Sequence, residues 1–175
     1  ERQLRVRSGS AVIELDRILI GEVWLCAGQS NMQWPVHQSS NGRKAMELPL
    51  DESFRLLNFQ GRVGGNSGVY GQADFSALRS EVFGQGTWEV ASPASIKDFS
   101  AVGYYFGNEI RSVLKSPVGL INVAAGGTPV ESWVESKILA GRTDLKRMVK
   151  GNWLDNPILD IWCKSRARGN LRDGL

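Results

Sequence analysis

The chain has 175 residues, of which 42% are hydrophobic, and a net charge of +3 at pH 7. This length and composition fit one globular domain with a sizeable core. The basic residues are scattered, which argues against a nucleic-acid-binding protein, and no apolar run is long enough to insert into a membrane. Two cysteines are too few for a disulfide scaffold, and we expect Cys26 to be a small buried thiol.

The N-terminal third predicts the first strands. Charged and apolar residues alternate over residues 1–20, as in an edge strand or a hairpin. Residues 18–27 are almost continuously apolar, which predicts a buried strand of a parallel sheet. This strand stops at Gly28, where a tight exit is possible, and a serine and three amides follow within five positions: Gln29, Ser30, Asn31 and Gln33.

The next elements alternate between strands and a helix. Residues 54–59 and 88–90 predict short strands, and the glycine-rich residues 61–86 between them predict a long loop. Residues 102–114 carry apolar side chains at steps of three and four after a capping Ser100, which predicts a helix packed on the sheet. Pro117 should end it. Residues 118–125 then predict another apolar strand, which stops at two glycines.

The order of strand, helix and strand predicts a parallel α/β sheet, whose strands share one carboxyl edge. Ligands of open α/β sheets bind at that edge. We therefore expect Ser30 to lie close to Gly126 and Gly127. A hydroxyl beside exposed backbone N–H groups suits acyl transfer, since the hydroxyl attacks and the N–H groups stabilise the oxyanion. The glycine signatures of phosphate loops and dinucleotide folds are absent, which argues against a nucleotide- or phosphate-binding domain.

The chain contains a single histidine, His37. A Ser-His-Asp mechanism needs an imidazole within reach of the serine oxygen. His37 lies shortly after Ser30 and beyond Pro35, a spacing that favours a surface or cleft-lining side chain over a catalytic base.

Three segments carry a family resemblance. Residues 21–32 read GEVWLCAGQSNM, residues 100–106 read SAVGYYF, and residues 118–122 (VGLIN) lead to residues 126–133 (GGTPVESW). In this order they resemble the sialate O-acetylesterase family, a branch of the SGNH hydrolases grouped with carbohydrate acetylesterases. The resemblance implies a flavodoxin-like three-layer α/β/α fold with a parallel sheet. It also implies that a serine nucleophile hydrolyses O-acetyl esters on a carbohydrate partner, without a metal or cofactor, in a secreted or periplasmic protein.

The same resemblance assigns roles to individual positions. Ser30 is the nucleophile, and its own N–H and the backbone of Gly126 or Gly127 donate to the oxyanion. The other matching residues lie beside the cleft or shape the turn: Glu131 and Trp133 in the first group, Gln29 and Asn31 in the second. Among the tryptophans, only Trp34 and Trp133 are expected near this site.

The chain also departs from the family pattern. A later Gln-Gly-Glu motif and an Asp-x-x-His segment that supplies the catalytic base are both missing. We therefore expect residues 1–17 to be the tail of a preceding β domain or an edge strand, and residues 18–175 to be the N-terminal part of an esterase domain that is incomplete at its C-terminus and has little activity alone. The alternative is an inactive carbohydrate-binding or structural module on the same fold. The basic residues 164–168 are interpreted as a solvated helix face.

Overall fold

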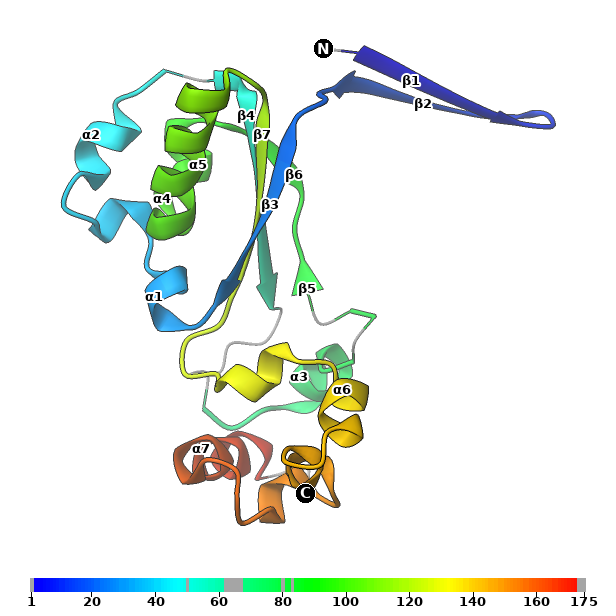
Figure 1. Cartoon of the computed structure of the whole chain (residues 1–175), viewed down its shortest axis with the longest axis vertical. Helices are drawn as coiled ribbons and strands as arrows, with labels where there is room; N and C mark the ends of the chain where they lie inside the picture. The colour runs from blue at the N-terminus through cyan, green and yellow to red at the C-terminus, as the bar shows by residue number, and fades with distance from the viewer. Residues whose placement is uncertain (1, 50, 62–67, 80, 83, 173–175) are drawn as a thin grey trace.

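Strands and short helices alternate along the chain in a computed structural model, which describes residues 2–49, 51–61, 68–79, 81–82 and 84–172 (Figure 1). The strands are β1 (Arg2–Ser8), β2 (Ala11–Ile18), β3 (Glu22–Gly28), β4 (Asp51–Gly61), β5 (Gly84–Gln85), β6 (Trp88–Ala91) and β7 (Val118–Ala124). The α-helices are α1 (Ser30–Gln33), α2 (Gly42–Met46), α3 (Gln72–Ala77), α4 (Pro93–Lys97), α5 (Ala101–Leu114), α6 (Ser136–Gly141) and α7 (Ile161–Leu171). Short 3₁₀ turns are η1 (Val36–Gln38), η2 (Val130–Trp133), η3 (Lys146–Val149) and η4 (Trp153–Asp155).

The main sheet has the strand order β3-β7-β4, with β7 parallel to both neighbours. Strands β5 and β6 both pair with β4 and run antiparallel to it. The predicted α/β class with parallel central strands is therefore confirmed. In the register of β3 against β7, Gly28 pairs with Ala124, so the two strands end level with each other.

Helix α5 packs on this sheet, as its apolar periodicity predicted. The Ser100 hydroxyl caps the helix by accepting from the Gly103 N–H at 3.0 Å. Under the helix, the ring of Tyr104 stacks on that of Phe54, with 5.8 Å between ring centres. The helix ends at Leu114, and the capping residue Lys115 adopts a left-handed conformation with φ of 53°, just before Pro117.

Strand β3 differs from the prediction of a fully buried strand. It begins at Glu22 and lies at the edge of the sheet, and Val23 and Leu25 are 62% and 65% exposed. Only Cys26 on this strand is buried, as expected for a small thiol, and burial raises its pKa. The physical reason is that α1, α2, α4 and α5 all lie on one face of the sheet (Figure 1), so in the described part of the chain the second apolar face of β3 has no covering layer.

The glycine-rich stretch predicted as one long loop is partly structured. Residues 62–67, 80 and 83 lie outside the described residues. The remainder contains α3 and β5, so the prediction was wrong for those residues. The Asp74 carboxylate explains the helix start, since it accepts a hydrogen bond from the Gly71 N–H at 2.8 Å.

Strands β1 and β2 form a separate two-stranded antiparallel sheet that projects away from the rest of the molecule (Figure 1). Leu4 pairs with Leu15, and Val6 pairs with Ile13, so these four apolar side chains share one face, and all are exposed. A two-stranded ribbon is marginally stable alone, so such a face favours a further β partner. The assignment of residues 1–17 to a preceding β domain stays a prediction.

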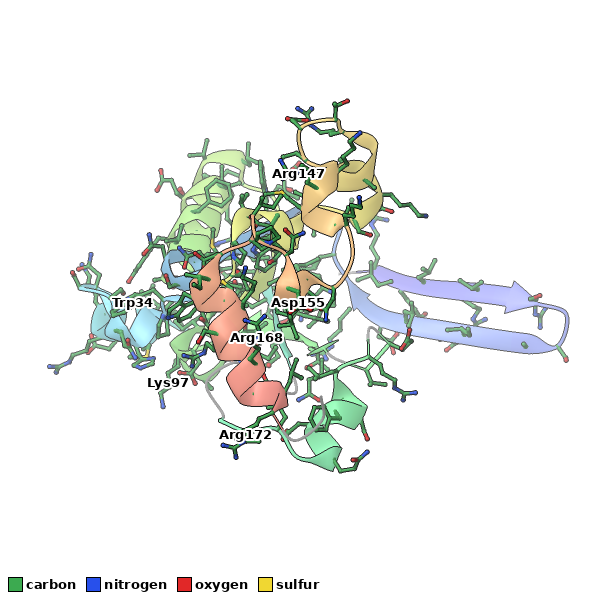
Figure 2. The ribbon with its side chains drawn as sticks, turned by 90° about the horizontal axis from the view of Figure 1, so that it is seen from below. Trp34, Lys97, Arg147, Asp155, Arg168 and Arg172 are labelled. Carbon is green, nitrogen blue, oxygen red and sulfur yellow. The ribbon has the colours of Figure 1, made fainter. Side chains whose placement is uncertain are left out.

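The C-terminal part forms a helical segment beyond the carboxyl ends of β3, β7 and β4 (Figure 1). The interpretation of its basic residues as solvated was wrong for Lys164, which is buried and whose ammonium donates to the Asn156 carbonyl at 2.5 Å. Arg168 likewise donates to the Leu154 carbonyl and to the adjacent Asp155 (Figure 2). These side chains tie α7 to η4, because long basic side chains can bury their stems while the charged head finds oxygen.

Candidate active site

The ends of β3 and β7 bring the predicted site residues together. The Ala125 N–H donates to the Gly28 carbonyl at 3.0 Å, which extends the strand pairing by one step. A Cβ placed on Gly126 would lie 3.7 Å from both Cα and Cβ of Ser30. Ser30 is exposed at this edge, and the expected proximity of the serine to the glycine pair is therefore observed.

Contacts with the start of α5 fix helix α1, which carries Ser30. The Ser100 hydroxyl lies 3.2 Å from the Met32 sulfur. Just after α1, the Ala101 N–H donates to the Trp34 carbonyl, and the Val36 N–H donates to the Phe99 carbonyl at 3.0 Å. Val36 and Phe99 are fully buried, so the segment that follows the serine is anchored in the core.

Gln29 engages the serine directly. Its side-chain Oε1 accepts hydrogen bonds from the Ser30 hydroxyl at 2.7 Å and from the Ser30 N–H at 2.9 Å. The hydroxyl proton thus points at an amide oxygen, which accepts a hydrogen bond but does not serve as a base. The Gln29 amide oxygen also accepts from the Ser30 N–H, which is the group that the resemblance assigns to oxyanion binding.

The Gln33 side chain makes a similar hydrogen bond to the backbone of the glycine pair. Its Oε1 accepts the Gly126 N–H at 2.8 Å, which joins α1 to the exit of β7. The sequence marked Gln33 as one of three amides but gave it no role. Its position three residues after Ser30, on the same side of a helical turn, was the available signal. By contrast, the Gly127 N–H has no acceptor among the described residues.

The remaining predicted site residues take different positions. The Trp133 indole donates to the Thr128 hydroxyl at 3.1 Å, and that hydroxyl donates to the Ala125 carbonyl at 2.7 Å, so Trp133 braces the loop after β7. Glu131 is half-buried and lines a cavity that begins at Gly126 and Gly127. Asn31 is exposed on α1.

His37 is held away from the serine hydroxyl. Its Nδ1 lies 3.0 Å from the Lys97 carbonyl and 3.3 Å from an Asp98 carboxylate oxygen, and its Nε2 lies 3.2 Å from the Gln38 amide nitrogen. Because a carbonyl only accepts, these contacts assign the proton to Nδ1 and leave Nε2 to accept from Gln38. Both ring nitrogens are therefore engaged, and Ser30 is not their partner.

Two kinds of feature are absent from the described part of the chain: metal-binding clusters and membrane spans. Across residues 2–172 without the gaps given above, no group of three or more His, Cys, Asp or Glu side chains could hold a metal ion. Within the same residues, no helix has the length and apolar character to cross a bilayer.

Comparison with solved structures gives the class of the fold. The chain superposes on a carbohydrate acetylesterase from Xanthomonas citri with a TM-score of 0.61 and 30% identity, covering 81% of this chain and 30% of that one. The fold and the arrangement of its strand ends thus define an α/β protein of the SGNH hydrolase type.

Comparison with curated proteins gives the family, although no family profile matches the chain. The chain is 35% identical to human sialate O-acetylesterase over 126 residues, which are 70% of this chain and 23% of the relative. It is 28% identical to the rat sialate O-acetylesterase over 143 residues, which are 78% of this chain and 24% of the relative. The chain belongs to the sialate O-acetylesterase family, and it spans about a quarter of the length of these relatives.

Proposed function

We propose that this chain carries the nucleophile of a serine esterase that removes O-acetyl groups from carbohydrates. The observation that carries the proposal is the meeting of Ser30 and Gly126 at the level ends of two parallel strands. The names of the related proteins, sialate O-acetylesterase and carbohydrate acetylesterase, support the choice of an acetylated sugar as the substrate.

In the proposed reaction, the Ser30 Oγ attacks the acetyl carbonyl carbon while its proton passes to a general base. The oxyanion accepts hydrogen bonds from the Ser30 N–H and from Gly126 or Gly127, and collapse of the intermediate expels the sugar oxygen, which takes up the proton. Water then releases acetate from the serine. Since Gln29 and Gln33 occupy two of these N–H groups, their amides must give way to the oxyanion, whereas the Gly127 N–H needs no such change.

We propose that the general base comes from a segment outside these 175 residues, as the family pattern implies. The only histidine of the chain, His37, is engaged by Lys97 and Gln38 through its two ring nitrogens. Loss of one member of a Ser-His pair lowers turnover about a millionfold, so the chain alone should have little activity. In this proposal it is a fragment of a longer esterase.

The test incubates the chain with p-nitrophenyl acetate, with and without added imidazole as a substitute base. Mass spectrometry then measures acetylation of the peptide that contains Ser30. We expect imidazole-dependent acetylation in the parent chain and in the His37→Ala variant, and none in Ser30→Ala.

Two outcomes would overturn parts of the proposal. Ser30-dependent turnover without imidazole that is lost in His37→Ala would make His37 the base. Equal acetylation of the parent and Ser30→Ala would remove the nucleophile, and would favour the alternative of an inactive carbohydrate-binding or structural module.

A further inference from the structure

A cavity of about 450 Å³ opens beside the glycine pair, between the loop after β7 and the C-terminal helical segment. Its volume lies within the range of small-molecule sites, about 300–1,000 Å³. The wall combines apolar side chains with polar groups and two indoles, and it includes Thr128, Glu131, Leu139, Met148, Trp153 and Trp162. Such a mixed wall is typical of a site that binds a ligand with both apolar and polar faces.

Trp162 links this cavity to the neighbourhood of the serine. A Cβ added to Gly127 would lie 2.7 Å from Cη2 of the Trp162 indole, so the ring packs directly on the backbone of that glycine. Gly126, the next residue, is the one that lies against Ser30. Ser30 itself does not line the cavity, but a ligand there would reach Gly126, which lines the cavity and lies against the serine.

The indoles are available to a ligand. Trp162 is 53% exposed, and Trp153 is 46% exposed in the same cavity. The guanidinium of Arg166 lies 5.3 Å from the centre of the Trp162 ring, close enough for a cation–π contact, and holds the indole in place. Exposed indoles combine an apolar face with a polar N–H. The C–H faces of pyranose rings stack on such apolar surfaces.

The charged groups of the wall also suit a sugar better than a phosphate. The carboxylates of Glu131 and Asp160 line the cavity, and they accept hydrogen bonds from hydroxyl groups but repel phosphate. The same wall also holds two cations, and both are engaged: the Lys164 ammonium donates to the Asn156 carbonyl, and the Arg166 guanidinium lies over the Trp162 ring.

We propose that this cavity binds the pyranose ring of the O-acetylated sugar, with Trp162 as the stacking wall that places the acetyl group at Ser30. The inference rests on the proposed esterase function, and it assigns the sugar-binding role to a residue that lies outside the three sequence segments of the family resemblance. In this proposal Trp162 is a substrate-binding residue, because it contacts the sugar ring and not the ester.

The test measures binding of sugars that carry no ester, so that it does not depend on hydrolysis. The chain is labelled with 5-fluorotryptophan, and each ¹⁹F signal is assigned by substitution. Methyl β-D-xylopyranoside and N-acetylneuraminic acid are titrated separately across the millimolar range. We expect at least one of them to shift the Trp162 signal saturably, in the parent chain and equally in Ser30→Ala.

Substitutions then test the stacking. In these variants the ¹⁹F signal of Trp153, which lines the same cavity, reports binding. Trp162→Ala should weaken binding about tenfold, and Trp162→Phe should retain most of it, because an aromatic ring contact contributes on the order of one decade in affinity. Trp88→Ala is the matched control, since Trp88 is 47% exposed on β6 and does not line the cavity. It should bind like the parent chain.

Two results would overturn the inference. One is that neither sugar shifts the Trp162 signal. The other is that Trp88→Ala and Trp162→Ala weaken binding equally. If a sugar binds as expected but Ser30 is never acetylated in the esterase test, the proposed chemistry fails while the sugar site stands.

Discussion

The Gly127→Ala substitution tests how tightly the loop after β7 is built against α7. Gly127 has a φ of +81°, in the left-handed region that alanine rarely adopts. The added methyl carbon would lie 2.7 Å and 2.8 Å from Cη2 and Cζ3 of Trp162, closer than real Cβ contacts allow. Either the loop or the indole must move.

Backbone strain at position 127 and overpacking against Trp162 together set the expected loss in the free energy of unfolding. Left-handed backbone costs a non-glycine residue about 1–2 kcal/mol. Overpacking in a core costs about 1–3 kcal/mol, and the half-exposed Trp162 places this contact at the low end of that range. We therefore expect a loss of about 2–3 kcal/mol in the free energy of unfolding, which for a chain of this size lowers the melting temperature by about 5–10 °C.

Thermal and urea unfolding measure this loss, and ¹⁹F-labelled Trp162 reports the displaced indole. Gly141→Ala is the control, because Gly141 ends α6 with an ordinary φ and its added Cβ would meet nothing within 4 Å. That variant should be neutral or slightly more stable. Equal melting temperatures for the two variants, with an unmoved Trp162 signal, would refute the packing of the indole on Gly127.

Two further predictions concern α5 and α7. Gly107→Ala should lower the free energy of unfolding measured in urea, because the added Cβ would lie 2.7 Å from Leu120 Cδ1 and 3.0 Å from Phe54 Cζ. Core overpacking costs about 1–3 kcal/mol, which exceeds the gain in helix propensity of at most about 1 kcal/mol. A more stable variant would contradict this. Asp160 caps α7, and the hydrogen bond that it accepts from the Cys163 N–H lowers the pKa of its carboxyl group. The ionised carboxylate therefore stabilises the fold at neutral pH, and this stabilisation is lost as the pH falls through the lowered pKa. Thermal unfolding of Asp160→Ala and the parent should therefore differ at neutral pH and converge in acid, and a pH-independent difference would argue against the carboxylate as the cap.

Local patterns in the sequence were sufficient to predict the framework of the site. Hydrophobic periodicity shows which face of an element is buried, and it can be recognised from residues that are neighbours in the sequence. The apolar runs of β3 and β7 and the periodicity of α5 are of this kind. Parallel strands of one sheet necessarily share a carboxyl edge, although the strand that α5 connects to β7 is β6, which runs antiparallel to β4 and hence to β7. The proximity of Ser30 to Gly126 followed from this rule alone.

The tertiary structure decided the contacts within that framework. The edge position of β3 depends on which strands find partners, so its apolar run did not indicate burial on both faces. The hydrogen bonds of Gln29 and Gln33 depend on the orientation of α1, which the buried Val36 and Phe99 fix.

The side-chain contacts of the C-terminal segment were the least predictable from the sequence. The burial of Lys164 and the packing of Trp162 on Gly127 join residues that are distant in the chain and belong to no shared motif. Periodicity reports which side of an element faces a core, but it does not report which distant side chain completes a pocket. By itself, the sequence therefore determined the sheet, the helix and the serine at its edge, whereas the walls of the cavity beside that serine were decided only by the packing of the whole chain.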